Sequence, residues 1–289
     1  MPTCSISFNQ DDAMMQPYLS ITLFLSAVSG SVFATEVYRS EDAQGRITYS
    51  DAVSVGSREV KIDSRSYRHL HHVTKVYDGD TVELENGQRV RLLGVNTPEV
   101  ESRLRENEPG GIAAKEWLAA QVQDKKIYLE FDQEKRDKYK RLLAHLFLLN
   151  GKHINLALLE NGLAIVNIMP PNVRYTDALV AAQQSAEKQK SGIWSKVEYQ
   201  PHTLAQISKK HAAGWQRYIG TPESIRQGKK YTRLIFSDRV DVRIANQHLK
   251  LFPALQTYVG KSLEIRGWVS RSKGQYSIQI QHPSALVQR

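Results

Sequence analysis

The sequence predicts a mainly β protein with helices: a small barrel that carries three helices, followed by a second small β-barrel. Five β-like segments form the first series, at 73–77, 81–85, 89–95, 127–131 and 142–149. Three helical patterns accompany them, at 111–123, 155–163 and 175–190. A second series of β-like segments follows, at 231–236, 240–245, 263–269 and 276–281. Five strands with inserted and appended helices are typical of the oligonucleotide/oligosaccharide-binding (OB) barrel.

The first 34 residues differ in composition from the rest of the chain. They contain no Lys or Arg, and Tyr18–Ala34 is uncharged with an apolar stretch at 19–28. Val32 and Ala34 stand where signal peptidase reads small or modest side chains, so we expect a secretory signal peptide, cleavage after Ala34, and a periplasmic or secreted protein. An uncleaved anchor is the alternative, although the apolar stretch is short for a membrane span. Cleavage also removes Cys4, the single cysteine, which excludes disulfides and zinc–thiolate sites in the mature chain.

Residues 36–51 read as a β-hairpin, because two short β-prone runs flank a polar turn with Gly45. This segment resembles a small uncharacterised hairpin domain near the N-termini of exported bacterial proteins. The expected organisation therefore has five parts. They are a signal peptide (1–34), a hairpin domain with linker (35–66), an OB domain (67–198), a linker (199–214) and a basic OB-like module (215–289).

Within the OB domain, local signals set the expected turns and helix ends. Asn86-Gly87 favours a two-residue hairpin. Asn155 is expected to cap the second helix, and Gly162 lies near its end.

The charge is concentrated at one end of the chain. The net charge is +9, from 39 basic and 30 acidic residues, but 35–199 is neutral and 200–289 carries 15 basic against 4 acidic side chains. Such a composition excludes a disordered or multi-pass membrane protein and favours an anionic partner. The OB domain must therefore show its chemistry through motifs rather than through net charge.

Two motifs carry candidate chemistry: Val76-Tyr-Asp-Gly-Asp-Thr-Val82 and Val90-Arg-Leu-Leu-Gly-Val-Asn-Thr-Pro-Glu-Val100. A two-residue turn places Val82 opposite Arg91, which makes Asp80 and Arg91 diagonal neighbours about 7–8 Å apart. That distance leaves room for a metal ion and a phosphate between carboxylate and guanidinium. Taken singly, each motif is equally compatible with ordinary turn chemistry.

Together with three further motifs, these resemble the staphylococcal nuclease (thermonuclease) family over about residues 70–196. The further motifs are Asp137-Lys-Tyr-Lys-Arg141, Asn155-Leu-Ala-Leu-Leu-Glu-Asn-Gly-Leu-Ala164 and Ser191-Gly-Ile-Trp194. The resemblance implies an OB barrel with three helices and calcium-dependent hydrolysis of phosphodiesters in DNA or RNA. Mg²⁺ and Mn²⁺ are the alternative ions.

The resemblance also implies roles for individual residues. Arg91 and Arg141 would hold the scissile phosphate, and Glu99 would act as the general base on the attacking water. Asp78 would orient metal-bound water. Tyr139 would contact a nucleotide.

The metal ligands depart from the family pattern. Asp80 and the Thr97 carbonyl match, but Asn96 stands where the family has a second aspartate. An amide keeps an oxygen and loses a charge, so metal affinity should fall unless another carboxylate, such as Glu101, compensates. The family's pocket tyrosines are also absent from Asn167-Ile-Met-Pro-Pro-Asn172.

The basic module resembles, more loosely, the small OB-like modules that bind nucleic acid. Its basic and aromatic side chains interleave, as single-stranded nucleic acid requires. The residues expected to bind are Arg233, Arg243, Arg266, Trp268 and Arg271, with Arg239, Lys273, Tyr231, Phe236 and Tyr276 nearby. Two alternatives stay open: the rings form a barrel core, or the module adheres to an anionic envelope surface.

The sequence thus supports a metal-dependent nuclease, exported, with a DNA or RNA substrate and no evident protein partner. The alternative is a nucleic-acid-binding protein of the same fold that Asn96 has disabled.

Overall fold

The computed structural model describes residues 37–41, 47–50, 53, 56–60, 69–100, 107–208 and 215–289. The chain forms two compact units, divided after Asp63. Within the described residues, no helix is long and apolar enough to cross a membrane. The expected signal peptide lies outside the described residues.

The N-terminal unit contains a three-stranded antiparallel sheet. Its strands are β1 (Val37–Glu41), β2 (Ile47–Ser50) and β3 (Arg58–Val60), in the order β2-β1-β3. The expected hairpin is confirmed, with Tyr38 opposite Ser50. The expected linker differs from the structure, because it supplies β3, which pairs with the free edge of β1.

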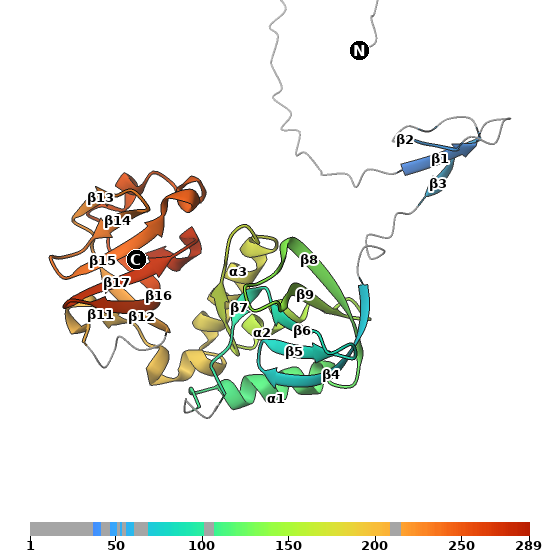
Figure 1. Ribbon diagram of the computed structural model, residues 1–289, viewed down its shortest axis with the longest axis horizontal. Coiled ribbons are helices and arrows are strands. Elements are labelled where there is room, and N and C mark those ends of the chain that lie inside the picture. The colour runs from blue at the N-terminus through green and yellow to red at the C-terminus, as the bar shows by residue number, and fades with distance from the viewer. Residues whose placement is uncertain are drawn as a thin grey trace, which may run out of the picture. The chain divides into compact units, whose positions relative to one another are not determined.

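The second unit begins with a closed five-stranded barrel in the order β4-β5-β6-β9-β8 (Figure 1). The strands are β4 (His69–Asp78), β5 (Thr81–Leu84), β6 (Arg89–Leu92), β8 (Lys126–Arg136) and β9 (Leu142–Leu148). The first three form an antiparallel meander, β6 runs parallel to β9, and β8 closes the barrel onto β4. This is the predicted OB barrel.

The segment predicted as one strand at 89–95 is interrupted. It forms β6 and then β7 (Gly94–Asn96), which leaves the barrel and pairs with β10 (Ile165–Asn167). Gly94 allows the break because its φ is +74° and a Cβ there would lie 2.4 Å from the Leu179 side chain.

The three predicted helices are confirmed as α1 (Gly111–Val122), α2 (Ile154–Glu160) and α3 (Thr176–Gln189). Asn155 is not the cap of α2 as expected; His153 holds that position. The fully buried Asn155 instead accepts a hydrogen bond from the Leu146 N–H and donates one to the Leu93 carbonyl, at 2.9 and 2.8 Å. It joins the helix to two parts of the sheet because buried backbone groups need partners.

The C-terminal strands form one sheet in the order β11-β12-β16-β17-β15-β14-β13, with β18 on β16 (Figure 1). They are β11 (His202–Thr203), β12 (Trp215–Gly220), β13 (Ser224–Gln227), β14 (Tyr231–Ile235), β15 (Val240–Ala245), β16 (Leu263–Ser272), β17 (Gln275–Ile280) and β18 (Leu286–Gln288). The connectivity repeats that of the barrel: an antiparallel meander, then a parallel pair, then an antiparallel strand.

The two differ at the first strand. In the barrel, β4 alone pairs with β5 at one end and β8 at the other. In the C-terminal sheet, that stretch is split into β12 and β13 around Pro222, which has no N–H to donate to a ladder. The C-terminal strands are therefore OB-like in connectivity, but they form an open sheet rather than the expected second closed barrel.

Two features hold the C-terminal sheet against the five-stranded barrel. The first is an apolar cluster of buried Ile165, Ala186, Ile193 and Trp194, onto which Trp215 packs. Full burial of an isoleucine side chain, as at Ile165 and Ile193, contributes about 1.5–3 kcal/mol. The sheet is thus anchored to α3 and the chain that follows it.

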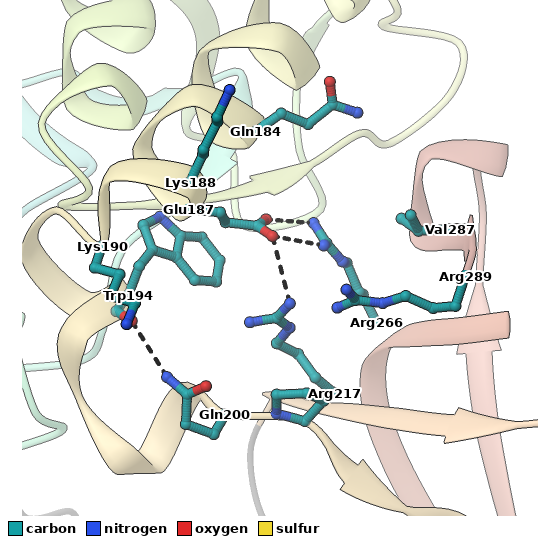
Figure 2. A pocket seen from close by; sticks show the side chains of 11 residues that line it. Gln184, Glu187, Lys188, Lys190, Trp194, Gln200, Arg217, Arg266, Val287 and Arg289 are labelled. Carbon is teal, nitrogen blue, oxygen red and sulfur yellow. Dashed lines mark hydrogen bonds and ion pairs between the residues drawn. The ribbon is translucent and has the colours of Figure 1, made fainter.

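The second feature is a buried ion network (Figure 2). Glu187 of α3 accepts from Arg266 at 2.6 and 2.9 Å and from Arg217 at 3.3 Å. Both arginines also donate to fully buried Glu264, at 2.7 Å each, and Arg289 pairs with it too. Burial alone raises the pKa of Glu264, but these arginines outweigh it and lower the pKa to about 2.

Candidate active site

Asp80 lies in the tight turn between β4 and β5. Its buried carboxylate accepts hydrogen bonds from the Thr97 N–H at 2.8 Å and from the Thr81 hydroxyl at 3.2 Å. Glycine is required beside it, because a Cβ on Gly79 would approach Ala114 and Thr97 to 2.6–2.7 Å. The Asp-Gly-Asp turn is thereby pressed against the segment that follows β7.

Arg91 contacts Asp80 directly. The turn after β5 has three residues, 85–87, rather than the expected two, since Gly87 takes φ +75° and the Leu84 N–H bonds to Gln88. Arg91 therefore stands opposite Thr81, not Val82, and its guanidinium forms an ion pair with the Asp80 carboxylate. The predicted gap between the Asp80 and Arg91 side chains is wrong, because the strand register differs from the expected one by one residue.

Asn96 completes a chain of contacts around Arg91. Its Oδ1 accepts from Arg91 Nη2 at 2.7 Å, and its Nδ2 donates to the Thr97 carbonyl at 3.2 Å. The three expected metal ligands are therefore neighbours. Among the described residues, no group of three His, Cys, Asp or Glu side chains gathers around a common point.

These ligands fit calcium in kind and are short of charge. A carboxylate, an amide oxygen and a backbone carbonyl are the hard oxygens that calcium prefers. Only Asp80 brings a formal charge, and it is already neutralised by Arg91. Glu101, the other candidate carboxylate, lies outside the described residues.

Glu99 is fixed through its backbone. Its N–H donates to the Glu108 carboxylate at 3.0 Å, and its carbonyl accepts from the Glu108 N–H at 2.9 Å. Nothing in the sequence spacing indicated this partner. The Glu99 side chain is half-buried, and its negative charge raises the pKa of Arg91 and so stabilises the charged form of that arginine.

Arg141 is oriented by Asp137. The Arg141 Nε donates to Asp137 Oδ2 at 2.8 Å, and the N–H groups of Arg141 and Tyr139 donate to Oδ1 at 3.0 and 2.9 Å. Burial alone raises the pKa of Asp137, but these hydrogen bonds outweigh it and lower the pKa. The role of Asp137 was missed by sequence reasoning, although the i, i+4 spacing to Arg141 was visible.

The charged groups of the site act on one another. Burial above all, together with the charge of Arg141, lowers the pKa of Arg91 to about 10, although the charges of Asp78, Glu99 and Asp137 oppose the change. Burial likewise raises the pKa of Asp78, against the charge of Arg91. The structure thus brings the predicted catalytic residues into one electrostatic cluster.

A pocket of ≈ 380 Å³ opens beside this cluster, and both Arg91 and Arg141 line it. Tyr139 stands at its edge, 68% exposed, with its ring centroid 5.6 Å from the Arg141 guanidinium carbon. Asn167 and Met169 line the wall where the resemblance would put tyrosines. The pocket therefore offers two guanidiniums, each held by a carboxylate, and one accessible ring.

The predicted binding residues of the C-terminal module separate into groups. Arg233, Arg243 and Trp268 lie on the face away from the module's core, as their Cα registers show. Arg266 shares that face but is buried in the ion network, where its guanidinium donates to Glu187 and Glu264, so the structure does not favour the expectation that it binds nucleic acid. Arg271 stands opposite buried Tyr276, at the other face of the β16–β17 hairpin.

The rings confirm part of the alternative interpretation. Phe236 and Tyr276 are buried in the module's core. Trp268 is 42% exposed.

The described residues thus form a closed OB barrel with two carboxylate-held arginines at one pocket. Comparison with known proteins identifies the family. Residues 89–196 match the model described as "Staphylococcal nuclease homologue", and residues 24–66 match "Domain of unknown function (DUF4124)".

Named relatives agree with this assignment. A thermonuclease of Staphylococcus intermedius is 37% identical over 127 residues, covering 43% of this chain and 75% of the relative. Endonuclease YncB of Bacillus subtilis (strain 168) is 33% identical over 198 residues, covering 65% and 92%. The chain belongs to the staphylococcal nuclease family.

Proposed function

We propose that this chain is an exported, calcium-dependent nuclease that hydrolyses phosphodiester bonds of DNA or RNA. One observation carries the proposal: Arg91, held by Asp80, and Arg141, held by Asp137, line the same pocket. Arginines oriented by carboxylates suit a phosphate because their fork geometry matches two phosphate oxygens. The nuclease names of the relatives support the same chemistry.

In this mechanism the protein groups position the phosphate and move one proton. Arg91 and Arg141 donate hydrogen bonds to phosphate oxygens and stabilise the negative charge that grows in the transition state. Glu99 accepts the proton of the attacking water. Asp80, Asn96 and the Thr97 carbonyl would hold calcium, which would supply further neutralisation of the phosphate.

The Asp80–Arg91 pair has a consequence for binding. Each of these side chains neutralises the other, so both must exchange partners when phosphate and metal arrive. With Asn96 in place of a second carboxylate, that exchange needs a higher metal concentration.

A second candidate is a nucleic-acid-binding protein without activity, which the Asn96 contacts favour. The Oδ1 of Asn96 is occupied by Arg91, and its amide by Thr97. The two candidates share a substrate and differ in turnover.

One experiment separates them. Purified chain from Thr35 onward is incubated with plasmid and single-stranded DNA in calcium, magnesium or manganese, beside Glu99→Gln. Cleavage by the native chain and its loss in Glu99→Gln, with DNA binding retained, supports the nuclease. Retained binding without cleavage in any of the three ions sinks it.

Export rests on the uncharged apolar segment before Thr35. The test is N-terminal sequencing of the protein recovered from the periplasm and medium of an expressing bacterium. A chain beginning at Thr35 is expected. A chain that starts at Met1 and stays in the cytoplasm would contradict export.

A further inference from the structure

The outer face of the C-terminal sheet carries a row of residues that no sequence spacing reveals. Cross-strand registers place six side chains side by side, one from each of six strands. In order along the row they are Arg226, Arg233, Arg243, Gln279, Trp268 and Trp215. With strands about 4.8 Å apart, this cross-strand row spans about 24 Å.

The arginine end of the row is electrostatically unfavourable by itself. Arg226, Arg233 and Arg243 are direct cross-strand neighbours, and like charges in that arrangement destabilise a sheet. Among the described residues, one carboxylate pairs with these arginines: Asp241 accepts from Arg233 at 2.6 Å. Three guanidiniums against one carboxylate leave a local excess of positive charge that an anion would relieve.

Within the part of the chain that the structure describes, Arg243 also lacks a hydrogen-bond partner for one of its nitrogen atoms. Its Nη2 donates to the Ser270 hydroxyl at 3.3 Å, and its guanidinium carbon lies 5.5 Å from the centroid of Tyr231. Its buried Nε has no hydrogen-bond partner among the described residues. Buried N–H groups are normally satisfied, so this atom also points to a missing acceptor.

The tryptophan end of the row lies beside the catalytic pocket. Trp268 and Gln279 line a small cavity of ≈ 60 Å³ against β10, and Asn167 lines it too. Asn167 also lines the pocket that holds Arg91 and Arg141. A nucleic-acid strand that leaves this pocket past Asn167 therefore meets the exposed Trp268 ring first and the arginines of the row next.

We propose that the cross-strand row binds the single-stranded continuation of the nucleic acid held in the catalytic pocket, with a base stacked on Trp268 and phosphates on Arg243, Arg233 and Arg226. The occupant is a single strand because stacking on Trp268 requires an unpaired base face. This inference rests on the proposed function for the identity of the ligand, and its test is arranged to be independent of cleavage.

The test measures binding of a fluorescein-labelled 20-nucleotide single strand to the full chain by fluorescence anisotropy, with EDTA present. Arg233→Gln/Arg243→Gln is expected to weaken binding about tenfold and to reduce the slope of log affinity against log salt by about 1.4, because two phosphate contacts are lost. Trp268→Ala is expected to weaken binding about tenfold through lost stacking.

The matched control is Lys250→Gln/Lys261→Gln. It removes two exposed charges from the same module, outside the strands of the row, and should bind within about twofold of the native chain. Because Arg233 also pairs with Asp241, exposed Arg226→Gln serves as a second row variant, and thermal unfolding confirms that each variant is folded.

The outcomes separate this inference from the nuclease proposal. Row variants that bind like the lysine control overturn the inference, even if the chain cleaves DNA. Loss of binding in the row variants upholds it, even if the native chain cleaves in no metal. Equal loss from Trp268→Ala for the single strand and for its duplex would overturn the assignment to a single strand.

Discussion

The nuclease barrel and the C-terminal sheet share one connectivity and carry different chemistry. In the barrel, the turn between the first two meander strands is Gly79-Asp80, with Asp78 before it. The corresponding turn of the C-terminal sheet, between β13 and β14, is Gly228-Lys229-Lys230. The first supplies the Asp80 carboxylate that pairs with Arg91, and the second supplies only positive charge.

Their arginines differ in the same way. Arg91 and Arg141 are each held by a carboxylate at the wall of a pocket, which suits transition-state stabilisation. The C-terminal arginines form a row on an open face, which suits binding along a strand. The fold provides the same frame in both regions, while the residues on its turns and faces decide the chemistry.

The largest expected effect separates the two sets of arginines. Arg141→Ala should lower the cleavage rate of single-stranded DNA about 10³-fold, because one donor to the charged transition state is lost. The control Lys126→Gln removes an exposed charge from β8 outside the pocket and should cleave at the native rate. Initial rates under saturating metal measure both; an effect of Arg141→Ala below about tenfold would break the division between the two regions.

The next largest effect concerns the free energy of unfolding, which should depend more on a buried ion network than on an exposed ion pair. Glu264→Gln should destabilise the chain by about 3 kcal/mol, because Arg217 and Arg266 are left buried without their carboxylate. Glu83→Gln on the barrel, which pairs with Arg89 across 3.9 Å, should cost below about 1 kcal/mol. Urea unfolding of both variants measures the difference, and equal losses would contradict the role given to the buried network.

The two regions should also lose stability in different pH windows. Burial above all, and then the neighbouring His153, lower the pKa of His145 to about 3, with Arg174 acting in the same direction and Glu130 opposing. The neutral ring also contacts Tyr175 edge-on. The neutral His145 ring contributes fully to the free energy of unfolding above pH 6.5. Below that pH the contribution falls, by about 2 kcal/mol at pH 5.

The contribution of Glu264 behaves differently. It is present above its unfolded pKa, near 4.5, and is lost as the pH falls toward about 2. Urea unfolding at a series of pH values should therefore show that the free energy of unfolding falls between pH 6.5 and 5. His145→Gln should flatten this fall, and Glu264→Gln should leave it unchanged. A slope unaffected by His145→Gln would assign the loss to another group.

The smallest expected effect concerns the missing carboxylate. Asn96→Asp adds a charge beside Asp80 and should lower the calcium concentration for half-maximal binding about tenfold, as measured by calorimetry. The control Asn86→Asp adds the same charge in the exposed hairpin turn and should leave calcium binding unchanged. Equal affinities of Asn96→Asp and the native chain would show that position 96 does not contact the ion.

The sequence by itself determined the barrel, its three helices and the residue types of the site. Alternation of apolar side chains and the turn residues are local signals, and the nuclease motifs are short enough to be read in one stretch. Even Asp137, which orients Arg141, stands four residues from it.

Tertiary structure decided which of these residues meet. A three-residue turn rather than a two-residue one shifted Arg91 by one position and joined it to Asp80. Arg266 and Arg243 look alike in the sequence, yet α3 covers the first with Glu187 and leaves the second in an open row. Strand partners come from distant parts of the chain, so register and docking, rather than local pattern, separate an arginine buried in an ion network from one that lies on an open face of the sheet.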